Sequence, residues 1–190
     1  MEKFKIGIIV GSNRRESLNR KFAQALAKLG AGQFTFSFVQ IDDLPLYNQD
    51  LEADMPKSVT RFKSELAATD GFLFVTPEHS RSIPAVLKSA IDWGARPYGK
   101  NSWGGKPAAI TGTSPGAIST AVAQAHLRQI LGVLGVLVMG GEAYIAFKPE
   151  LIGANGEIAD EAARTFLQAY LDQFAALVAK FAPTRAQRAA

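Results

Sequence analysis

The chain has no cysteine and only two histidines among its 190 residues. Without cysteine it cannot form disulfides, present a thiolate nucleophile, relay electrons through thiols or bind an iron–sulfur cluster through cysteine ligands. His79 and His126 lie far apart in the sequence and have no ligand-like neighbours, so a zinc site is not expected. Any redox chemistry therefore requires a bound organic cofactor.

Other signals are missing as well. No stretch approaches the roughly 20 uninterrupted apolar residues of a membrane-spanning helix. The apolar run at 4–10 ends in Gly11-Ser12-Asn13 rather than in a cleavage site, which predicts a strand instead of a signal peptide, and hence a cytoplasmic protein. The dinucleotide glycine fingerprint and the P-loop are both absent, which argues against a Rossmann dinucleotide site and an NTPase.

The charge pattern favours a small anionic ligand over a nucleic acid. The net charge is +4, but no DNA- or RNA-binding motif accompanies it. Several of the cations gather around the first loop, where Arg14, Arg15, Arg20 and Lys21 lie close together in sequence.

Strand and helix patterns alternate along the chain, which predicts an α/β domain over residues 1–182, followed by a disordered tail at 183–190. Right-handed crossovers then require a doubly wound parallel sheet of five strands. The pattern alone does not fix the strand order, but order 2-1-3-4-5 is favoured because it creates a ligand crevice at the switch point. The predicted strands are 4–10, 34–41, 71–76, 108–111 and one that begins at 136–139, and the predicted helices are 17–30, 56–69, 84–93, 118–134 and one through 163–181.

The first loop, residues 11–19, carries the groups that bind a phosphate without a metal. It offers hydroxyls at Ser12 and Ser17, an amide at Asn19, a guanidinium at Arg14 and the free N–H groups of a helix start. Hydrogen bonds to a charged group contribute roughly 1.5–3 kcal/mol each. The alternative is that Ser17 is only a helix N-cap with exposed arginines beside it.

Two more polar loops follow the third and fourth predicted strands. Residues 76–84 place polar groups between Pro77 and Pro84, and residues 111–117 are small enough for backbone to approach a ring system. In order 2-1-3-4-5 these loops adjoin the first. His79 could then abut a flat heterocycle, although a surface loop would have the same composition.

Together the three loops resemble the NADPH-dependent FMN reductase family, and within it the chromate and quinone reductase branch. The resemblance rests on residues 11–19, on residues 77–84 with 87–93, and on residues 114–118, in that order, and it covers about residues 4–147. It implies a flavodoxin-like fold, tightly bound FMN, and two-electron transfer from NADPH or NADH to quinones, with side activity on chromate and other oxidants.

The resemblance also implies the site residues. Ser12, Arg14, Ser17 and Asn19 would hold the FMN phosphate. The flavin ring would be lined by Pro77, Glu78, His79, Ser80 and Ser82 and closed on its other side by Ser114, Pro115 and Gly116. No conventional catalytic residue is expected, because the flavin N5 carries the hydride. His79 could assist protonation of a reduced quinone, but a positional contact is favoured. Arg81 could meet the phosphate of the nicotinamide donor, or it could equally be an exposed or interface arginine.

This chain departs from the family at two places. Ser80 stands where the family usually has Asn, which would weaken one contact to the flavin. Ser119-Thr120 replaces a common Gly-Gly pair, which leaves the geometry of the third loop open.

Three further interpretations concern neighbouring residues and rival functions. Arg128, with Glu142, resembles the family's inter-subunit charge network and predicts a homodimer or homotetramer; without the family, Arg128 is a solvated helix charge. Trp93, Tyr98 and Trp103 suggest a substrate wall or an oligomer contact more than plain core. The rival functions are a flavodoxin-like one-electron carrier and a flavin-free regulator with the same fold.

Overall fold

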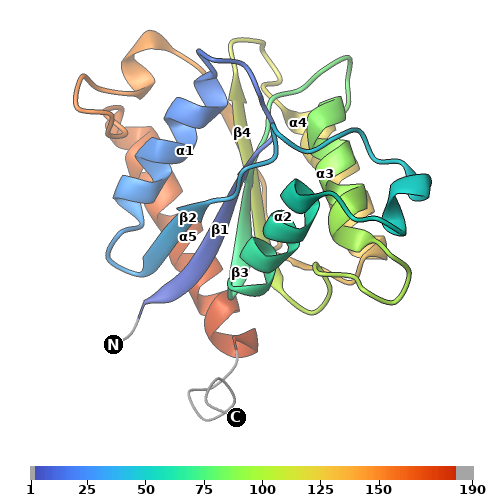
Figure 1. The fold of residues 1–190 in the computed structure, drawn as a ribbon. Coiled ribbons are helices and arrows are strands. Elements are labelled where there is room, and N and C mark those ends of the chain that lie inside the picture. Colours follow the sequence, from blue (N-terminus) through green and yellow to red (C-terminus); the bar gives the residue numbers. More distant parts are fainter. Residues whose placement is uncertain (1–2, 183–190) are drawn as a thin grey trace.

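The computed structural model describes residues 3–182, and in this range a parallel sheet lies between two layers of helices (Figure 1). The predicted tail at 183–190 lies outside the described residues. No helix within 3–182 is long and apolar enough to cross a membrane. The strands are β1 (Phe4–Val10), β2 (Phe34–Phe38), β3 (Gly71–Val75), β4 (Pro107–Ser114), β5 (Leu137–Val138) and β6 (Ala143–Ala146), and the helices are α1 (Leu18–Leu29), α2 (Lys57–Ala67), α3 (Ala85–Ala95), α4 (Ala121–Val133) and α5 (Glu161–Phe181), with 3-10 turns η1 (Gln49–Glu52) and η2 (Pro149–Leu151).

The sheet has the predicted order, β2-β1-β3-β4-β5, and all pairs are parallel. Its last position is shared by two short strands. β5 pairs with the start of β4 and β6 with its end, and Gly140-Gly141 separates them. The doubly wound flavodoxin-like topology is thereby confirmed, with its switch point between β1 and β3.

The alternating side chains of the central strands build a separate core on each face of the sheet. On β3, Leu73 and Val75 face the layer of α1 and α5, whereas Phe72 and Phe74 face α2, α3 and α4. All four side chains are fully buried, as expected for a central parallel strand covered on both sides. This rigid sheet fixes the loops at its carboxyl edge, which lies at the top of Figure 1.

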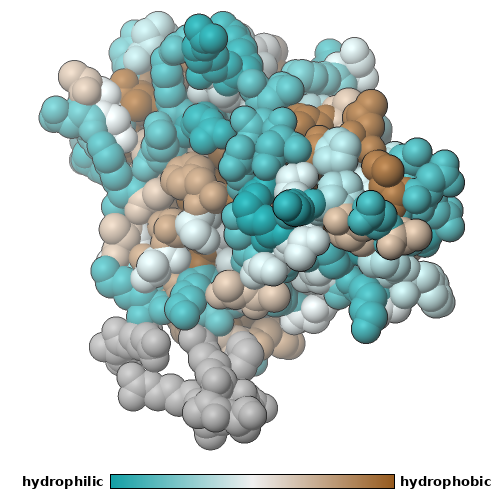
Figure 2. All heavy atoms as spheres, viewed as in Figure 1, coloured by the Kyte–Doolittle hydropathy of each residue, from teal (hydrophilic) through white to brown (hydrophobic). Residues whose placement is uncertain are grey.

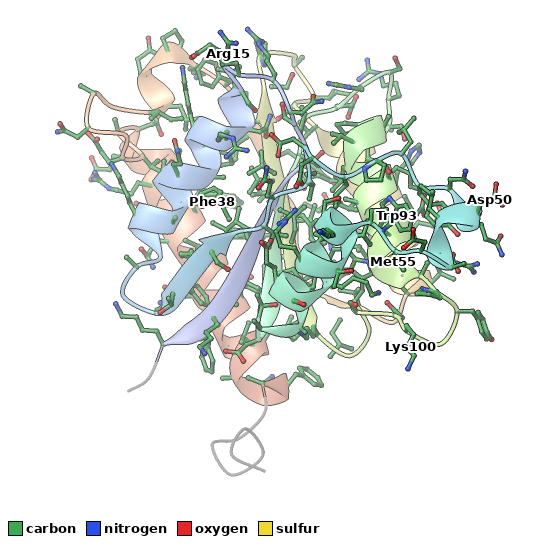
Figure 3. The ribbon with its side chains drawn as sticks, in the orientation of Figure 1. Arg15, Phe38, Asp50, Met55, Trp93 and Lys100 are labelled. Carbon is green, nitrogen blue, oxygen red and sulfur yellow. The ribbon has the colours of Figure 1, made fainter. Side chains whose placement is uncertain are left out.

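The tryptophans belong to the core, and the interpretation of them as a substrate wall or an oligomer contact is wrong. Trp93 and Trp103 are both fully buried. The Trp103 ring contacts Phe72 with its centroid 5.0 Å away. The Trp93 indole N–H donates to the Pro45 carbonyl at 2.8 Å, and Figure 3 shows Trp93 inside the molecule on α3. Tyr98, in contrast, is 92% exposed.

Candidate active site

The three predicted loops meet at the carboxyl edge of adjacent strands β1, β3 and β4. Backbone hydrogen bonds extend the sheet into the loops: Gly11 N–H donates to the Val75 carbonyl at 2.9 Å and Thr76 N–H to the Thr111 carbonyl at 3.0 Å. Gly112 permits the closest approach, because a Cβ there would lie 2.0 Å from the Thr76 carbonyl oxygen. The loops are therefore held in a fixed relation to each other by the sheet itself.

The β1–α1 loop is shaped by its own serines. The Ser17 hydroxyl accepts from Arg20 N–H at 3.2 Å and so caps α1, and the Ser12 hydroxyl accepts from Arg14 N–H at 3.4 Å. Each hydroxyl still has a proton to donate to an anion. The capping role that the sequence left as an alternative is thus real, and it is compatible with phosphate binding.

Asn19 is buried, with 3% of its surface exposed, and it joins the start of α1 to β4. Its side-chain amide donates to the Thr113 carbonyl at 2.9 Å and accepts from the Thr113 N–H at 2.9 Å. One donor and one acceptor of the amide are therefore engaged by backbone. The structure gives Asn19 a positioning role across the crevice, in addition to the predicted phosphate contact.

The β3–α3 loop contains a two-residue hairpin turn. His79 and Ser82 exchange both backbone hydrogen bonds at 2.9 Å, and the two residues between them have left-handed backbones, with φ of +50° at Ser80 and +63° at Arg81. Positive φ at both central positions is typical of a type I′ turn. The turn leaves the side chains of His79 and Ser80 exposed.

Glu78 connects this loop to α4. Its Oε2 accepts from the N–H groups of Val122 and Ala123, each at 3.0 Å, and its Oε1 accepts from Arg81 at 2.8 Å. α4 has no side-chain cap from its own N-cap residue, Thr120, so Glu78 takes that role. Burial works to raise the pKa of Glu78, but the backbone N–H groups and the Arg81 guanidinium outweigh it, and the pKa lies below its ordinary value.

The β4–α4 loop is held at both ends by serines. The Ser114 hydroxyl accepts from Gly116 N–H at 3.2 Å. Ser119 has φ of +51°, a conformation that glycine adopts more readily than serine, and the helix α4 starts at residue 121 rather than at the predicted 118. Its hydroxyl donates to the Ile145 carbonyl at 2.7 Å and compensates for the unfavourable backbone. Between these anchors Pro115 and Gly116 are exposed.

Two side chains of α4 complete the surroundings. The His126 ring nitrogen Nδ1 lies 3.2 Å from the Ser82 hydroxyl, a contact that the sequence pattern did not reveal. Arg128 donates to the carbonyls of Met139, at 2.7 Å, and Gly141. Arg128 is therefore not simply a solvated charge, because it holds the turn between β5 and β6. Nearby, burial and the Glu142 carboxylate raise the pKa of Tyr144 to about 12.

Comparison with known proteins identifies the group to which these loops belong. A family model described as NADPH-dependent FMN reductase matches residues 4–150. The chain belongs to this family. It is 50% identical over 175 residues to a 2-hydroxy-1,4-benzoquinone reductase of Burkholderia sp, covering 92% of this chain and 96% of the relative.

Two further relatives agree with the family assignment. A quinone reductase of Pseudomonas putida is 46% identical over 177 residues, covering 92% of this chain and 95% of the relative. Among solved structures, the flavoenzyme NAD(P)H:(acceptor) oxidoreductase FerB from Paracoccus denitrificans superposes with a TM-score of 0.91 at 45% identity, covering 95% of this chain and all of that one. This FMN reductase is accordingly an oxidoreductase, and the predicted family and enzyme class are confirmed.

Proposed function

We propose that this FMN reductase uses bound FMN to transfer two electrons, as a hydride, from NADPH or NADH to quinones. The observation that carries the proposal is the convergence of three polar loops at the β1/β3 switch point, in a chain of this family. Quinones are the substrate class because the relatives from Burkholderia sp and Pseudomonas putida are named for quinone reduction. Chromate reduction is proposed only as a side activity.

The residues of the β1–α1 loop fit the phosphate of FMN. Arg14 is exposed, and within residues 3–182 it has no carboxylate partner. Ser12 and Ser17 have hydroxyl protons available, and the first turn of α1 has free N–H groups directed at the same place. We propose that these groups bind the phosphate and that Asn19 fixes their position relative to β4.

The flavin ring would lie between the β3–α3 and β4–α4 loops. One side of the ring site would be formed by Pro77, Glu78, His79, Ser80 and Ser82. The other side would be formed by Ser114, Pro115 and Gly116. When bound, FMN supplies the hydride chemistry at its N5. The task of the chain is to exclude water from one ring face, to leave the other open to donor and acceptor in turn, and to offer backbone N–H donors to the ring edge.

An anaerobic titration tests the function. The purified protein should show a flavin spectrum, bleach with one equivalent of NADPH and regain its colour with one equivalent of a benzoquinone. A yellow protein that NADPH and NADH do not bleach would favour the electron carrier, and a protein unable to take up FMN would contradict the proposal.

We further propose a homodimer or homotetramer in which Glu142 and Arg128 lie at an interface. Glu142 is exposed in the single chain, whereas Arg128 also holds its own chain together, so reversing Glu142 is the cleaner test. Glu142→Lys should lower the mass measured by light scattering, and an unchanged mass would remove Glu142 from the interface. The expected compartment is the cytoplasm, where NADPH and NADH are available.

A further inference from the structure

A cavity of about 420 Å³ lies between the β1–α1 loop and the segment that follows β2, and it shares Ser12 and Arg14 with the predicted phosphate site. One wall contains Ser12, Arg15 and Arg20, and the other contains Phe38, Gln40 and Asp42. The β3–α3 and β4–α4 loops do not line it. The cavity therefore overlaps the predicted phosphate site and extends from it toward the segment after β2, and Figure 2 shows hydrophilic residues over this part of the surface, between α1 and α2.

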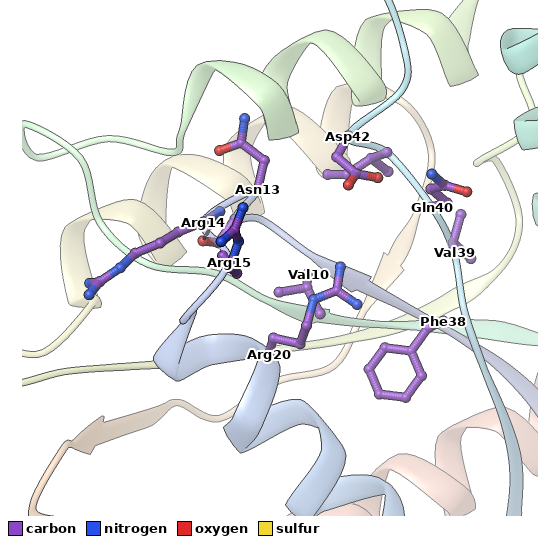
Figure 4. Close-up of a pocket in the computed structure, with 11 residues that line it drawn as sticks. Val10, Asn13, Arg14, Arg15, Arg20, Phe38, Val39, Gln40 and Asp42 are labelled. Atoms are coloured by element: carbon purple, nitrogen blue, oxygen red, sulfur yellow. Dashed lines mark hydrogen bonds between the residues drawn. The ribbon is translucent and has the colours of Figure 1, made fainter.

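Two guanidinium groups enter this cavity without a protein partner. Arg15 and Arg20 both line the cavity, and Figure 4 shows the Arg20 guanidinium extending toward Phe38, with Arg15 farther along the β1–α1 loop and Arg14 extending away. Within residues 3–182, the ion pairs that involve arginine use Arg61, Arg81 and Arg96. The carboxylate nearest in sequence, Glu16, is paired with Lys21 at 2.8 Å.

Phe38 adds an apolar surface to the cavity. It is 40% exposed, although most of the large apolar side chains in the fold are buried. An exposed aromatic face beside arginines suits a flat base, which can stack on the ring and on a guanidinium plane. Asp42, on the opposite side, can accept a hydrogen bond from a ribose hydroxyl or a base amino group. An inorganic anion has neither of these donors, so Asp42 favours a nucleotide.

We propose that this cavity binds the adenosine 2′-phosphate end of NADPH, with Arg15 and Arg20 on the phosphate and Phe38 against the adenine. The inference rests on the proposed function, because it requires a nicotinamide donor at the flavin. When the nicotinamide of the donor contacts the flavin ring, its adenosine must lie some distance from that ring. This cavity, next to the phosphate end of the FMN site, is a place where the adenosine could bind. Planar guanidinium forks match the oxygens of a phosphomonoester. In dinucleotide folds that prefer NADP, an arginine likewise accommodates the 2′-phosphate, although here the two arginines come from the β1–α1 loop and α1 rather than from the end of the second strand.

The site replaces Arg81 as the expected contact for the donor's phosphate. The Arg81 guanidinium is engaged by Glu78 at 2.8 Å, so a phosphate there would compete with an existing ion pair. Arg15 and Arg20 face no such competition, and neither residue belongs to the positions assigned to the FMN phosphate.

The test is calorimetric binding of adenosine 2′,5′-bisphosphate to the FMN-loaded protein, with adenosine 5′-monophosphate and inorganic phosphate as comparison probes. The bisphosphate should bind at least tenfold more tightly than either. Arg15→Ala and Arg20→Ala should each weaken it at least tenfold, and Asp42→Asn should tighten it about twofold by removing a like charge. Arg164→Ala, an exposed arginine on α5, removes the same charge elsewhere and should change binding less than twofold.

Steady-state kinetics provide the second readout: in Arg20→Ala the rise in KM for NADPH should exceed any rise for NADH at least tenfold. Equal binding of the three probes would mean a general anion site and overturn the inference. The inference would also be overturned if the Arg15→Ala and Arg20→Ala variants bound the bisphosphate as tightly as the wild type. The same holds if these variants lost FMN but kept their affinity for the bisphosphate. Bisphosphate binding requires no turnover, so the two proposals can fail separately. Quinone reduction by NADPH without specific bisphosphate binding would overturn only the inference about this cavity. Specific bisphosphate binding without quinone reduction would overturn only the proposed function.

Discussion

The two sides of the candidate site use their polar side chains in different ways. On the β3–β4 side, Glu78, Ser119 and His126 bind other parts of the chain and hold two loops together. On the β1–α1 side, the guanidinium groups of Arg14 and Arg15 face no carboxylate within residues 3–182. One side uses its polar groups to hold the chain together, and the other keeps its positive charge available to an anion.

This difference has an energetic consequence. Side chains that satisfy buried backbone groups contribute to folding, and their loss leaves unpaired donors or acceptors at about 1–3 kcal/mol each. Exposed cations without partners contribute little to folding but much to binding a phosphate. Substitutions on the β3–β4 side should therefore lower the stability of the fold, while those of the exposed arginines on the β1–α1 side should lower ligand affinity.

The largest effect is expected from Arg14→Ala combined with Ser17→Ala, which removes two predicted phosphate contacts. The loss should be about 3–6 kcal/mol of FMN binding, roughly a hundredfold or more in Kd. Fluorescence titration of the flavin-free protein measures it. Arg14→Ala alone is the informative control: FMN binding should weaken while the free energy of unfolding changes by less than about 0.5 kcal/mol. Unchanged flavin occupancy in the double variant would contradict the phosphate assignment.

Glu78→Ala tests the opposite side and should lower the free energy of unfolding by about 3 kcal/mol, measured by urea denaturation. The substitution leaves Val122 and Ala123 without their N–H acceptor at the start of α4 and frees Arg81. A loss below about 1 kcal/mol would show that α4 does not depend on this carboxylate, and the contrast between the two sides would then fail.

The pH dependence of Glu78 sharpens the same comparison. Its pKa in the folded protein lies below the ordinary value of 4.5, so the carboxylate contributes stability above pH 4.5. That contribution is lost as the pH falls through the lowered pKa. The wild type should therefore exceed Glu78→Gln in stability at neutral pH, and the difference should narrow in acid. A difference that is constant from pH 7 to pH 3 would be inconsistent with an ionised Glu78.

Asn19→Ala should cost about 2–3 kcal/mol of folding stability, although Asn19 lies on α1. The substitution leaves the buried N–H and carbonyl of Thr113 without hydrogen-bond partners. Because the Asn19 side chain holds the start of α1 against β4, the affinity for FMN should also fall, as measured by titration of the folded variant. Asn19→Asp separates the two polar contacts, since a carboxylate still accepts from Thr113 N–H but cannot donate to its carbonyl. If both variants are as stable as the wild type, Asn19 has no positioning role.

The sequence predicted the strands, the helices and the three loops well, because hydrophobic periodicity and turn residues are local signals, whereas the strand order was favoured only because it creates a ligand crevice. It misjudged lengths where tertiary contacts decide. β2 ends at Phe38 rather than at residue 41, and β4 continues to Ser114 because β6 pairs with Gly112–Ser114. Periodicity could not show that Glu78 caps a helix more than 40 residues away, or that Trp93 packs against the 45–47 segment.

The smallest effect is expected at the two serines with positive φ. Ser80 is exposed and has φ of +50°, and asparagine tolerates this region better than serine does. Ser80→Asn should therefore raise the unfolding free energy by about 0.5 kcal/mol, measured in urea, whereas Ser80→Ala should not raise it.

Ser119 has nearly the same backbone, with φ of +51°, but its hydroxyl binds the Ile145 carbonyl. Ser119→Gly would relieve the backbone and lose that hydrogen bond, each at about 1 kcal/mol, so the net change should be near zero. A similar gain from Ser80→Asn and Ser119→Gly would show that backbone strain alone governs both loops. A gain at Ser80 only would show that the Ser119 hydroxyl, by tying the β4–α4 loop to β6, offsets its unfavourable backbone.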